Sequence, residues 1–343
     1  MAVGVRPLDP AAHSAWDAFV RAQPHGTFFH LSTWRDVIAR AFGHRTYYVA
    51  AEQDGAITGV LPLVHMRTLV FGNTLVSAPF CVYGGPLCAD DESAQALQRY
   101  AERLCKETGA SAVEFRHRHA VESEWVERPE LYVTFRKGIS GSDDANMKAI
   151  PRKQRAMVRK GIQNGLTGVV SRSADPLHRI YAESVRNLGT PVFSRRYFQV
   201  LLEAFPGMSD VVTVLRDGSP VASVLNFYHG DEVLPYYGGG SSLARSCAGN
   251  DFMYWDVMRR AAARGCRLFD FGRSKLGTGS YAFKRNWGFE PEPLHYRYHL
   301  QPGSEIPDNN PLNPKYRLFV AAWKRLPLPV ANRLGPPIVR GLG

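Results

Sequence analysis

The sequence has few cysteines, no long apolar run and none of the common nucleophile, nucleotide or zinc-protease motifs. Its five cysteines are scattered, with neither a CxxC pair nor the Cys/His spacing of a zinc site, so we expect reduced thiols and no metal site. No apolar run approaches the roughly 18 residues of a membrane-spanning helix. The first thirty residues carry Asp9, Asp17 and prolines, which is unlike a signal peptide, and the cytoplasm is therefore the expected location.

Acidic residues are missing from one stretch altogether. Residues 145–174 contain no Asp or Glu. Six basic residues lie close together within residues 148–160 of this stretch: Lys148, Arg152, Lys153, Arg155, Arg159 and Lys160. Pro151 can begin a helix, which would place three of the arginines on one face. Because a solvated face normally carries acidic partners, this unpaired row favours a phosphate-bearing ligand, as does the net charge of +11.

The chain repeats one order of elements. A strand, an Asp54-Gly55 hairpin turn and a second strand in the first half are matched by the strands around Asp217-Gly218. Tyr83-Gly84-Gly85 is echoed by Tyr237-Gly238-Gly239. A predicted helix that ends at a glycine, and a strand with one carboxylate, follow each time. This order predicts a duplicated α/β domain.

The expected fold class is therefore α/β (α+β), with two tandem domains that each contain a twisted mixed sheet flanked by helices. We expect an N-terminal domain over 1–140, a C-terminal domain with the main site over 141–301, and a proline-rich tail over 302–343. The polar stretch 136–146 marks the boundary. The amphipathic piece 316–326 is predicted to pack across the second domain, with peripheral contact at the inner face of the membrane as the alternative.

Residues 269–288 form the most informative stretch. A short apolar strand runs into a Gly- and Ser-rich loop, and a Phe-Lys pair follows. Glycines let a backbone approach a ligand closely, and three cations could neutralise an anion there, namely Arg273, Lys275 and Lys284. An ordinary surface loop with solvated charges is the alternative.

Each of the other candidate site residues has two possible interpretations. Tyr236 and Tyr237 precede glycines at a strand end, where either a ligand or a β-bulge would explain them. Asn250 stands where a helix N-cap belongs, and capping alone would account for it. Asp270 is either a general base or a carboxylate that a neighbouring arginine holds.

Several of these residues together resemble a known family. The series comprises Asn250 to Trp255, Gly265, residues 269–273, Phe283-Lys284 and Trp287-Gly288. It is similar to the FemAB-type acyltransferases, which are built from two GNAT-fold domains and include the BioF2-like acetyltransferase domains. The resemblance covers roughly residues 28–300. It is closest to the FemAB-like proteins associated with exosortase/PEP-CTERM surface-protein and exopolysaccharide systems.

The resemblance implies two tandem GNAT-like domains and N-acyl transfer. An (amino)acyl group would move to an amine of a phosphorylated or anionic cell-envelope or exopolysaccharide precursor. Phe283 and Lys284 match the family's Phe-Lys pair, and Lys284 would be catalytic by placing positive charge against the oxyanion. Because the chain offers no nucleophile with a clear base partner, direct attack in a ternary complex is expected. The residues expected to bind substrate are Arg152, Arg155, Arg159, Tyr236, Tyr237, Asn250, Arg273, Lys275 and Phe283.

Three functional alternatives stay open. The acyl donor, a co-substrate in place of any tightly bound cofactor, is aminoacyl-tRNA in the first. It is an acyl-CoA or an acyl carrier protein in the second, since residues 245–250 match half of the pyrophosphate loop of acetyl-CoA-using GNAT enzymes. The third alternative is a non-catalytic protein that binds an anionic polysaccharide or RNA.

Overall fold

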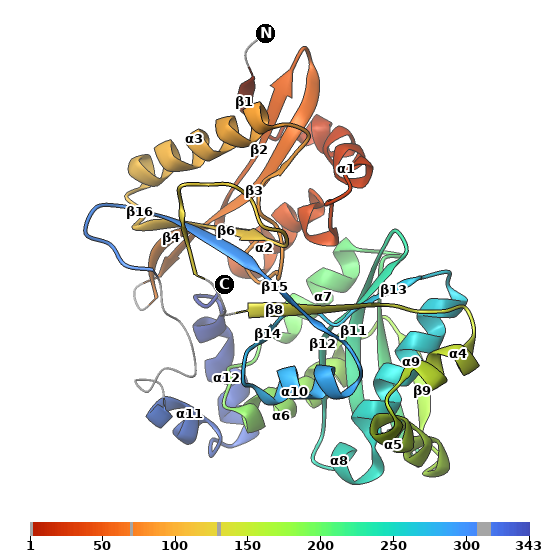
Figure 1. Ribbon diagram of the computed structural model, residues 1–343. Helices are drawn as coiled ribbons and strands as arrows, with labels where there is room; N and C mark the ends of the chain where they lie inside the picture. The colour runs from red at the N-terminus through yellow and green to blue at the C-terminus, as the bar shows by residue number, and fades with distance from the viewer. Residues whose placement is uncertain (1–2, 69–70, 129–131, 307–316) are drawn as a thin grey trace. The chain divides into compact units, whose positions relative to one another are not determined.

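A computed structural model describes residues 3–68, 71–128, 132–306 and 317–343 (Figure 1). The chain divides into two compact units. The first unit comprises Met1–Leu131, Pro293–Asn310 and Arg340–Gly343. The second unit comprises Tyr132–Glu292 and Pro311–Val339. Each unit is built around its own sheet of mixed strands.

The sheet of the first unit has the order β1-β2-β3-β4-β6-β16-β7, and β5 pairs with β3 beside it. The strands are β1 (Gly4–Pro7), β2 (Arg45–Gln53), β3 (Ala56–Thr68), β4 (Gly72–Ser77), β5 (Leu87–Cys88), β6 (Ala112–His117), β7 (Val126–Glu127) and β16 (His295–Leu300). The helices are η1 (Pro10–Ala12), α1 (His13–Ala22), η2 (Phe28–His30), α2 (Thr33–Phe42) and α3 (Asp91–Thr108).

Helix α3 covers one part of this sheet because its sequence is amphipathic and capped at both ends. The Asp90 side chain accepts a hydrogen bond from the Ser93 N–H, and Gly109 ends the helix in the left-handed conformation. The helix packs against β1, β2, β3 and β6, and it buries Leu97 and Leu104 in a core that includes Phe115. Burying a leucine side chain of this kind stabilises the fold by roughly 1.5–3 kcal/mol.

The sheet of the second unit has the order β14-β8-β13-β12-β11-β10-β9, and β15 also pairs with β8. The strands are β8 (Tyr132–Gly138), β9 (Thr167–Ser171), β10 (Ser209–Arg216), β11 (Ser219–His229), β12 (Glu232–Gly240), β13 (Leu268–Asp270), β14 (Ser274–Lys275) and β15 (Pro291–Pro293). The helices are α4 (Asp143–Ala149), α5 (Arg152–Gln163), α6 (Ala174–Leu188), α7 (Arg195–Ala204), α8 (Ala244–Cys247), α9 (Gly249–Ala263), α10 (Gly279–Asn286), α11 (Arg317–Trp323) and α12 (Leu328–Val339).

Helices α9 and α6 cover opposite faces of this sheet. Helix α9 is apolar on most sides, and its Met253 and Val257 share a core with Val224 of β11. Val224 lies opposite Gly238, whereas a Cβ on the next residue, Gly239, would meet Ser184 of α6. Because successive strand residues point to opposite faces, the two helices lie on the two sides of the sheet.

The repeat predicted from the sequence is present in both sheets. Asp54 and Asp217 both have positive φ, 51° and 49°, and each is followed by a glycine in the same region, as tight hairpin turns require. The two hairpins, β2–β3 and β10–β11, carry a register shift next to this turn. In each unit one strand pair is parallel, β4 with β6 and β12 with β13. The predicted fold of two mixed α/β domains is confirmed.

Each sheet is completed by a strand from the other half of the chain. β8 pairs antiparallel with β13, with Leu268 opposite Gly138. β16 pairs antiparallel with β6, with His295 opposite His117. The contiguous boundaries predicted from the sequence are therefore not those of the compact units: β8 begins the second unit, and 293–310 returns to the first. The stretch 136–146, predicted as a linker, holds the end of β8 and the start of α4.

Candidate functional site

The basic helix α5 begins at Arg152, and Pro151 is its N-cap rather than its first residue. It buries Gln154, Val158 and Gly161, and it packs against α9. Three arginines remain on the outer side: Arg152 and Arg159 are exposed, and Arg155 is half-buried. None of them forms an ion pair with a described residue, and the buried Nε of Arg155 has no hydrogen-bond partner there.

Helix α5 approaches α9 at the point where α9 begins. A Cβ on Gly161 would lie 2.8 Å from the Phe252 Cβ and 3.4 Å from the Ala248 carbonyl oxygen. Asn164 Nδ2 donates to the Cys247 carbonyl at 3.2 Å. The N-terminus of a helix carries partial positive charge and unpaired N–H groups, and α5 adds cations beside it. This part of the second unit is therefore suited to an anion.

Asn250 does not cap this helix. The N-cap is Ala248, in the left-handed conformation with φ of 61°, and Asn250 lies inside the first turn. Its Oδ1 is buried and has no hydrogen-bond partner among the described residues. Gly240 makes room for this oxygen, since a Cβ there would lie 2.5 Å from it. The capping interpretation is wrong, and the side chain presents an unused acceptor at the start of α9.

A buried carboxylate that the sequence did not single out links three helices. Asp251 Oδ1 accepts from Gln154 Nε2 of α5 at 3.1 Å and from Trp287 Nε1, after α10, at 3.0 Å. Burial raises the pKa of Asp251, while the bonds from Trp287 and Gln154 oppose that shift. An Asp in the first turn of a helix has an ordinary stabilising role, so no sequence signal marks this contact.

Lys284 lies on α10, a helix where the sequence predicted a loop followed by the Phe-Lys pair. Thr278 caps the helix at the Tyr281 N–H. The Lys284 side chain is buried, and its Nζ donates to the carbonyl oxygens of Gly272 and Arg273 at 2.9 and 3.0 Å. Burial lowers the pKa of Lys284 to about 7, with Asp270 opposing this shift and Arg273 adding to it.

Asp270 is held by its neighbours. Its Oδ1 accepts from the Gly272 N–H at 2.7 Å, and its Oδ2 lies 3.3 Å from the Nε of Arg136. Arg136 also pairs with Glu232. The side chain of Asp270 is fully buried. These contacts favour the second interpretation, in which an arginine holds this carboxylate for structure.

The remaining residues of the 269–288 stretch surround the same turn. Arg273 and Lys275 both lie over the ring of Tyr132, at 4.3 and 5.4 Å from its centroid. Phe283 packs with Tyr254, at a centroid distance of 5.6 Å, on the main core of the unit. The structure thus brings three of the predicted cations to one turn. No contact described joins them to the α5 arginines, and α5 and α10 are linked through Asp251.

The Tyr-Tyr-Gly segment of β12 has a structural explanation. The Tyr237 and Tyr197 hydroxyls share a buried hydrogen bond of 2.9 Å. Tyr236 is the extra residue of a β-bulge, since Leu225 pairs with Tyr237 and Asn226 with Pro235. Gly239 and Gly240 accommodate neighbouring side chains, as described above. These observations favour the bulge interpretation for both tyrosines.

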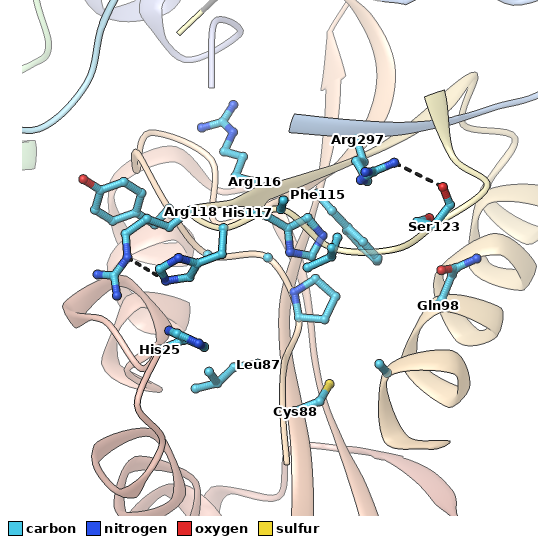
Figure 2. A pocket seen from close by; sticks show the side chains of 18 of the residues that line it. His25, Leu87, Cys88, Gln98, Phe115, Arg116, His117, Arg118, Ser123 and Arg297 are labelled. Atoms are coloured by element: carbon cyan, nitrogen blue, oxygen red, sulfur yellow. Dashed lines mark hydrogen bonds between the residues drawn. The ribbon is translucent and has the colours of Figure 1, made fainter. Parts of the chain in front are cut away.

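The first unit contains a cavity of about 330 Å³ that the sequence did not predict (Figure 2). Phe115, His117 and Arg297 line it from β6 and β16. Gly85 lets the His117 ring pack closely, because a Cβ there would lie 2.9 Å from the ring Nδ1. Burial, helped by the charge of Arg297, lowers the pKa of His117 to about 3. His117 therefore presents a neutral imidazole to the cavity.

Charged side chains of both signs line this cavity. Figure 2 shows His25 and Arg118 towards one end and Cys88 and Gln98 towards the other. Arg118 Nε donates to His119 at 3.2 Å, and the His119 ring lies 4.0 Å from that of His25. Asp90 and Asp91 line the cavity too, and burial together with these two carboxylates raises the pKa of Cys88 to about 12. Cys88 is therefore a thiol and no nucleophile at neutral pH.

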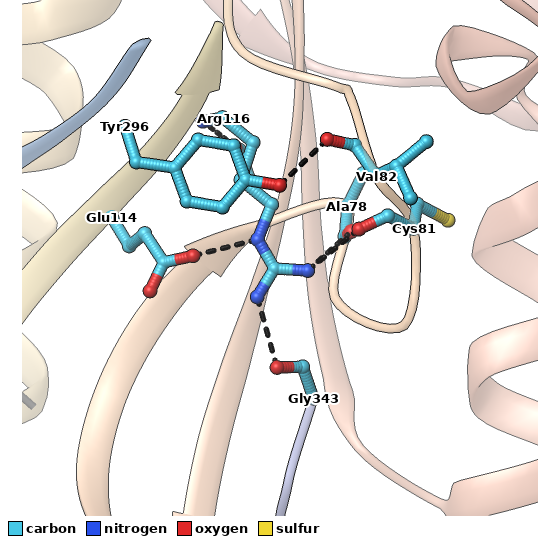
Figure 3. A network of polar contacts seen from close by, with 8 residues as sticks. Ala78, Cys81, Val82, Glu114, Arg116, Tyr296 and Gly343 are labelled. Carbon is cyan, nitrogen blue, oxygen red and sulfur yellow. Dashed lines mark hydrogen bonds and ion pairs between the residues drawn. The ribbon is translucent and has the colours of Figure 1, made fainter. Parts of the chain in front are cut away.

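A buried arginine holds the loop that forms one wall of this cavity (Figure 3). Arg116 Nε donates to Glu114 at 2.6 Å, and its Nη1 donates to the Cys81 carbonyl at 2.8 Å. Its Nη2 donates to the Gly343 carbonyl at 2.9 Å. The Tyr296 hydroxyl donates to the Val82 carbonyl at 2.7 Å. These hydrogen bonds fix the loop that leads to the cavity.

Within the described residues, no group of three His, Cys, Asp or Glu side chains is placed to hold a metal ion. The five cysteines are free. None of the helices in the described ranges has both the length and the hydropathy to cross a membrane.

Comparison with known proteins identifies the second unit. The acetyltransferase (GNAT) domain model matches residues 151–285, which lie within this unit, and the match supports an acyltransferase. The match runs from the residue before α5 to the residue after Lys284. No curated protein matches the chain in sequence.

Solved structures share the fold over most of the chain. FemX has a TM-score of 0.65 at 16% identity, covering 85% of this chain and 96% of its own. The C-terminal domain of a lysylphosphatidylglycerol synthetase from Agrobacterium fabrum has a TM-score of 0.56 at 13% identity, and the match covers 85% of this chain and 92% of that domain. A tandem GNAT protein from the clavulanic acid biosynthesis pathway has a TM-score of 0.53 at 13% identity, and the match covers 88% of this chain and 100% of that protein. At these identities the likeness shows the fold, which is that of two tandem GNAT-like domains.

Proposed function

We propose that the protein is a FemAB-like N-acyltransferase that moves an (amino)acyl group to an amine of a cell-envelope or exopolysaccharide precursor. The observation that carries this proposal is the acetyltransferase match over 151–285, which spans the basic helix α5, the start of α9 and Lys284. The match argues against the non-catalytic alternative. The association with exosortase/PEP-CTERM systems rests on the sequence resemblance.

The donor site is proposed at the start of α9. The N–H groups of its first turn and the arginines of α5 together suit a donor that carries phosphates. Aminoacyl-tRNA is the preferred donor, because the row of arginines along α5 extends well beyond one helix end and would follow a polyanionic backbone. An acyl-CoA or acyl carrier protein is the second candidate, and it needs only the contacts at α9.

The proposed chemistry is direct attack by the acceptor amine on the donor carbonyl. The N–C bond forms, an oxyanion develops on the carbonyl oxygen, and the C–O bond of an ester or the C–S bond of a thioester then breaks. The proton that the amine loses is taken up by the leaving alkoxide or thiolate. Lys284 is proposed to stabilise the oxyanion. A lysine ammonium has three donors, and two of them bind Gly272 and Arg273. The third remains for the reacting oxygen.

The cavity of the first unit is proposed as a separate binding site for a small molecule with charged groups. Asp90 and Asp91 in its lining suit an ammonium group, and Arg118 suits a phosphate or carboxylate. A neutral His117 would accept a hydrogen bond from such a molecule without repelling a positive charge.

The test compares donors directly. Charged tRNA in a gel-shift titration at several salt concentrations, with uncharged tRNA beside it, is set against calorimetric titration with acetyl-CoA. Salt-sensitive binding of tRNA alone supports the first donor, and binding of acetyl-CoA alone supports the second. Phosphoethanolamine serves as the model acceptor, with ethanolamine and inorganic phosphate as its two halves. If neither donor binds and no acyl transfer to an amine is detected, the proposal fails.

A further inference from the structure

Helix α11 carries apolar side chains on its solvent side. It buries Trp323 and part of Val320 against the second unit, whereas Leu318 is 86% exposed and Phe319 40% exposed. Ala321 and Ala322 are exposed as well. A surface helix normally turns its polar side to water, so this outward apolar face is an anomaly for a helix that contacts only solvent.

Helix α12 repeats the pattern. Its inward residues include Ala331 and Gly335, and a Cβ on Gly335 would lie 2.8 Å from the backbone nitrogen of Val192. On the outer side, Val330 is 42% exposed and Leu334, four residues later, 46% exposed. The two side chains therefore lie next to each other along one helix face.

The end of α6 extends this apolar surface. Leu188, its last residue, is 69% exposed. The next residue, Gly189, lies against α11: a Cβ there would be 2.5 Å from Val320 Cγ1 and 3.2 Å from Lys324 Cε. Leu188 therefore lies beside α11. Exposed apolar side chains rarely gather like this on a monomer unless the patch binds something.

The charges around this surface have one sign. No Asp or Glu occurs from residue 309 to residue 343. Exposed cations border the apolar side chains: Arg317, Lys324, Arg325 and Arg333. None of these four pairs with a described carboxylate. In a symmetric dimer formed through this surface, the cations of the two copies would face each other, and their repulsion disfavours such a dimer.

We propose that α11, α12 and the end of α6 form a docking surface for an anionic phospholipid bilayer. The exposed leucines, Phe319 and Val330 would enter the boundary between headgroups and acyl chains, and the four cations would meet lipid phosphates. This proposal uses residues outside the proposed transfer site, so it stands or falls separately from the proposed function.

Co-sedimentation of the full chain with vesicles tests the proposal. Vesicles of phosphatidylcholine are compared with vesicles that contain phosphatidylglycerol at roughly 30%. We expect binding to the anionic vesicles only, weakened severalfold when salt is raised from low to physiological concentration. The double substitution Leu318→Asp with Phe319→Asp should lower the partition coefficient by about tenfold or more, because it removes apolar area and adds like charge to the lipid.

Two further variants make the result specific. Val169→Asp with Val170→Asp is the matched control, since both valines are about as exposed as Phe319 but lie on β9. It should leave vesicle binding unchanged. Lys324→Gln with Arg325→Gln should weaken binding and reduce its salt dependence. Thermal melting checks that each variant is folded.

Three results would overturn the proposal. One is the absence of binding to anionic vesicles. Another is equal binding by the Leu318/Phe319 variant and its matched control. The last is a dimer in size-exclusion chromatography without lipid that the Leu318/Phe319 substitutions abolish, which would assign the surface to a second copy of the chain.

Discussion

Helices α3 and α9 occupy matching places in the repeated order of elements but differ in the charge around their first turns. Helix α3 starts with Asp90 as its cap and has Asp91 and Glu92 in its first turn. Helix α9 starts after a left-handed Ala248, has a single acidic residue in its first turn, the buried Asp251 that Gln154 and Trp287 bind, and has the basic helix α5 packed beside it. Acidic residues at a helix start satisfy its N–H groups internally, whereas an uncapped start remains available to an external anion.

The comparison shows that the same order of elements carries different charge at equivalent positions. The first unit has a cavity with carboxylates at its helix start, and the second has a basic surface. We propose that the fold positions the ligands and that the local side chains select them. Substitutions of those side chains should therefore reduce the difference in ligand binding that we propose between the two units.

The largest effect is expected from Lys284→Met, which removes the proposed positive charge and keeps most of the bulk. Losing one preorganised donor typically costs ~10²–10³ in rate, so kcat should fall far more than KM rises. Steady-state kinetics of acyl transfer measures the split. Lys284→Arg should restore activity only in part, because a planar guanidinium cannot place a compact charge at the same point. Wild-type turnover by Lys284→Met would move the positive centre elsewhere.

Removing the charge of α5 should make the second unit resemble the first. The triple substitution Arg152→Gln, Arg155→Gln and Arg159→Gln is expected to weaken donor binding by about tenfold to a hundredfold and to flatten its salt dependence. Gel shift or calorimetry at three salt concentrations measures both. The matched control is Arg6→Gln with Arg21→Gln and Arg103→Gln, three largely exposed arginines of the first unit. If both triple variants bind the donor with equal affinity, the arginines of α5 form only an ordinary solvated face.

The buried Lys284 also predicts how stability depends on pH. Its pKa in the folded protein, about 7, lies below the ordinary value of 10.5. Between these values the unfolded chain binds the additional proton, so this group makes stability increase with pH, by up to about 1.4 kcal/mol per pH unit. Urea unfolding at pH 7.5, 8.5 and 9.5 should show a steeper rise for the wild type than for Lys284→Met. Parallel curves would mean that Lys284 keeps its ordinary pKa.

The smallest effect is expected from Asn250→Asp, which gives α9 a carboxylate like those at the start of α3. The two side chains have nearly the same shape, so the change tests charge alone. Donor affinity should fall by about threefold to tenfold, because a negative charge would stand where the donor's phosphates bind. Asn250→Ser is the neutral control and should change affinity less. Tighter donor binding in Asn250→Asp would contradict the proposed anion site.

Local signals in the sequence were sufficient for several elements. The Asp-Gly turns, the glycines after α3 and α9 and the repeated order of strands all depend on neighbouring residues, and the structure contains them. The basic side of α5 also follows from spacing alone, since residues three and four apart share a helix face. The structure leaves that row without described ion pairs, as the missing acidic residues predicted.

Contacts between residues that are distant in the sequence could not be predicted from such local signals. Asp251 joins Gln154 and Trp287 across 97 and 36 residues, and its sequence context is that of any acid in a first helical turn. The Asn250 cap was predicted from its place before an apolar run, but the N-cap is the left-handed Ala248, two residues earlier. The cavity around His117 depends on strands and loops that fold together from separate parts of the chain.

By itself the sequence determined the class of fold, the duplication and the position of the unpaired cations, because turns, caps and periodicity are local properties of the chain. Only the tertiary structure decided that β8 and β16 exchange between the two sheets, because strand pairing depends on edges that exist only after each sheet has formed. The low pKa of Lys284 was decided in the same way. Its sequence neighbours indicate a cation but not its burial, and packing of α10 onto the turn after β13 removes the ammonium from water.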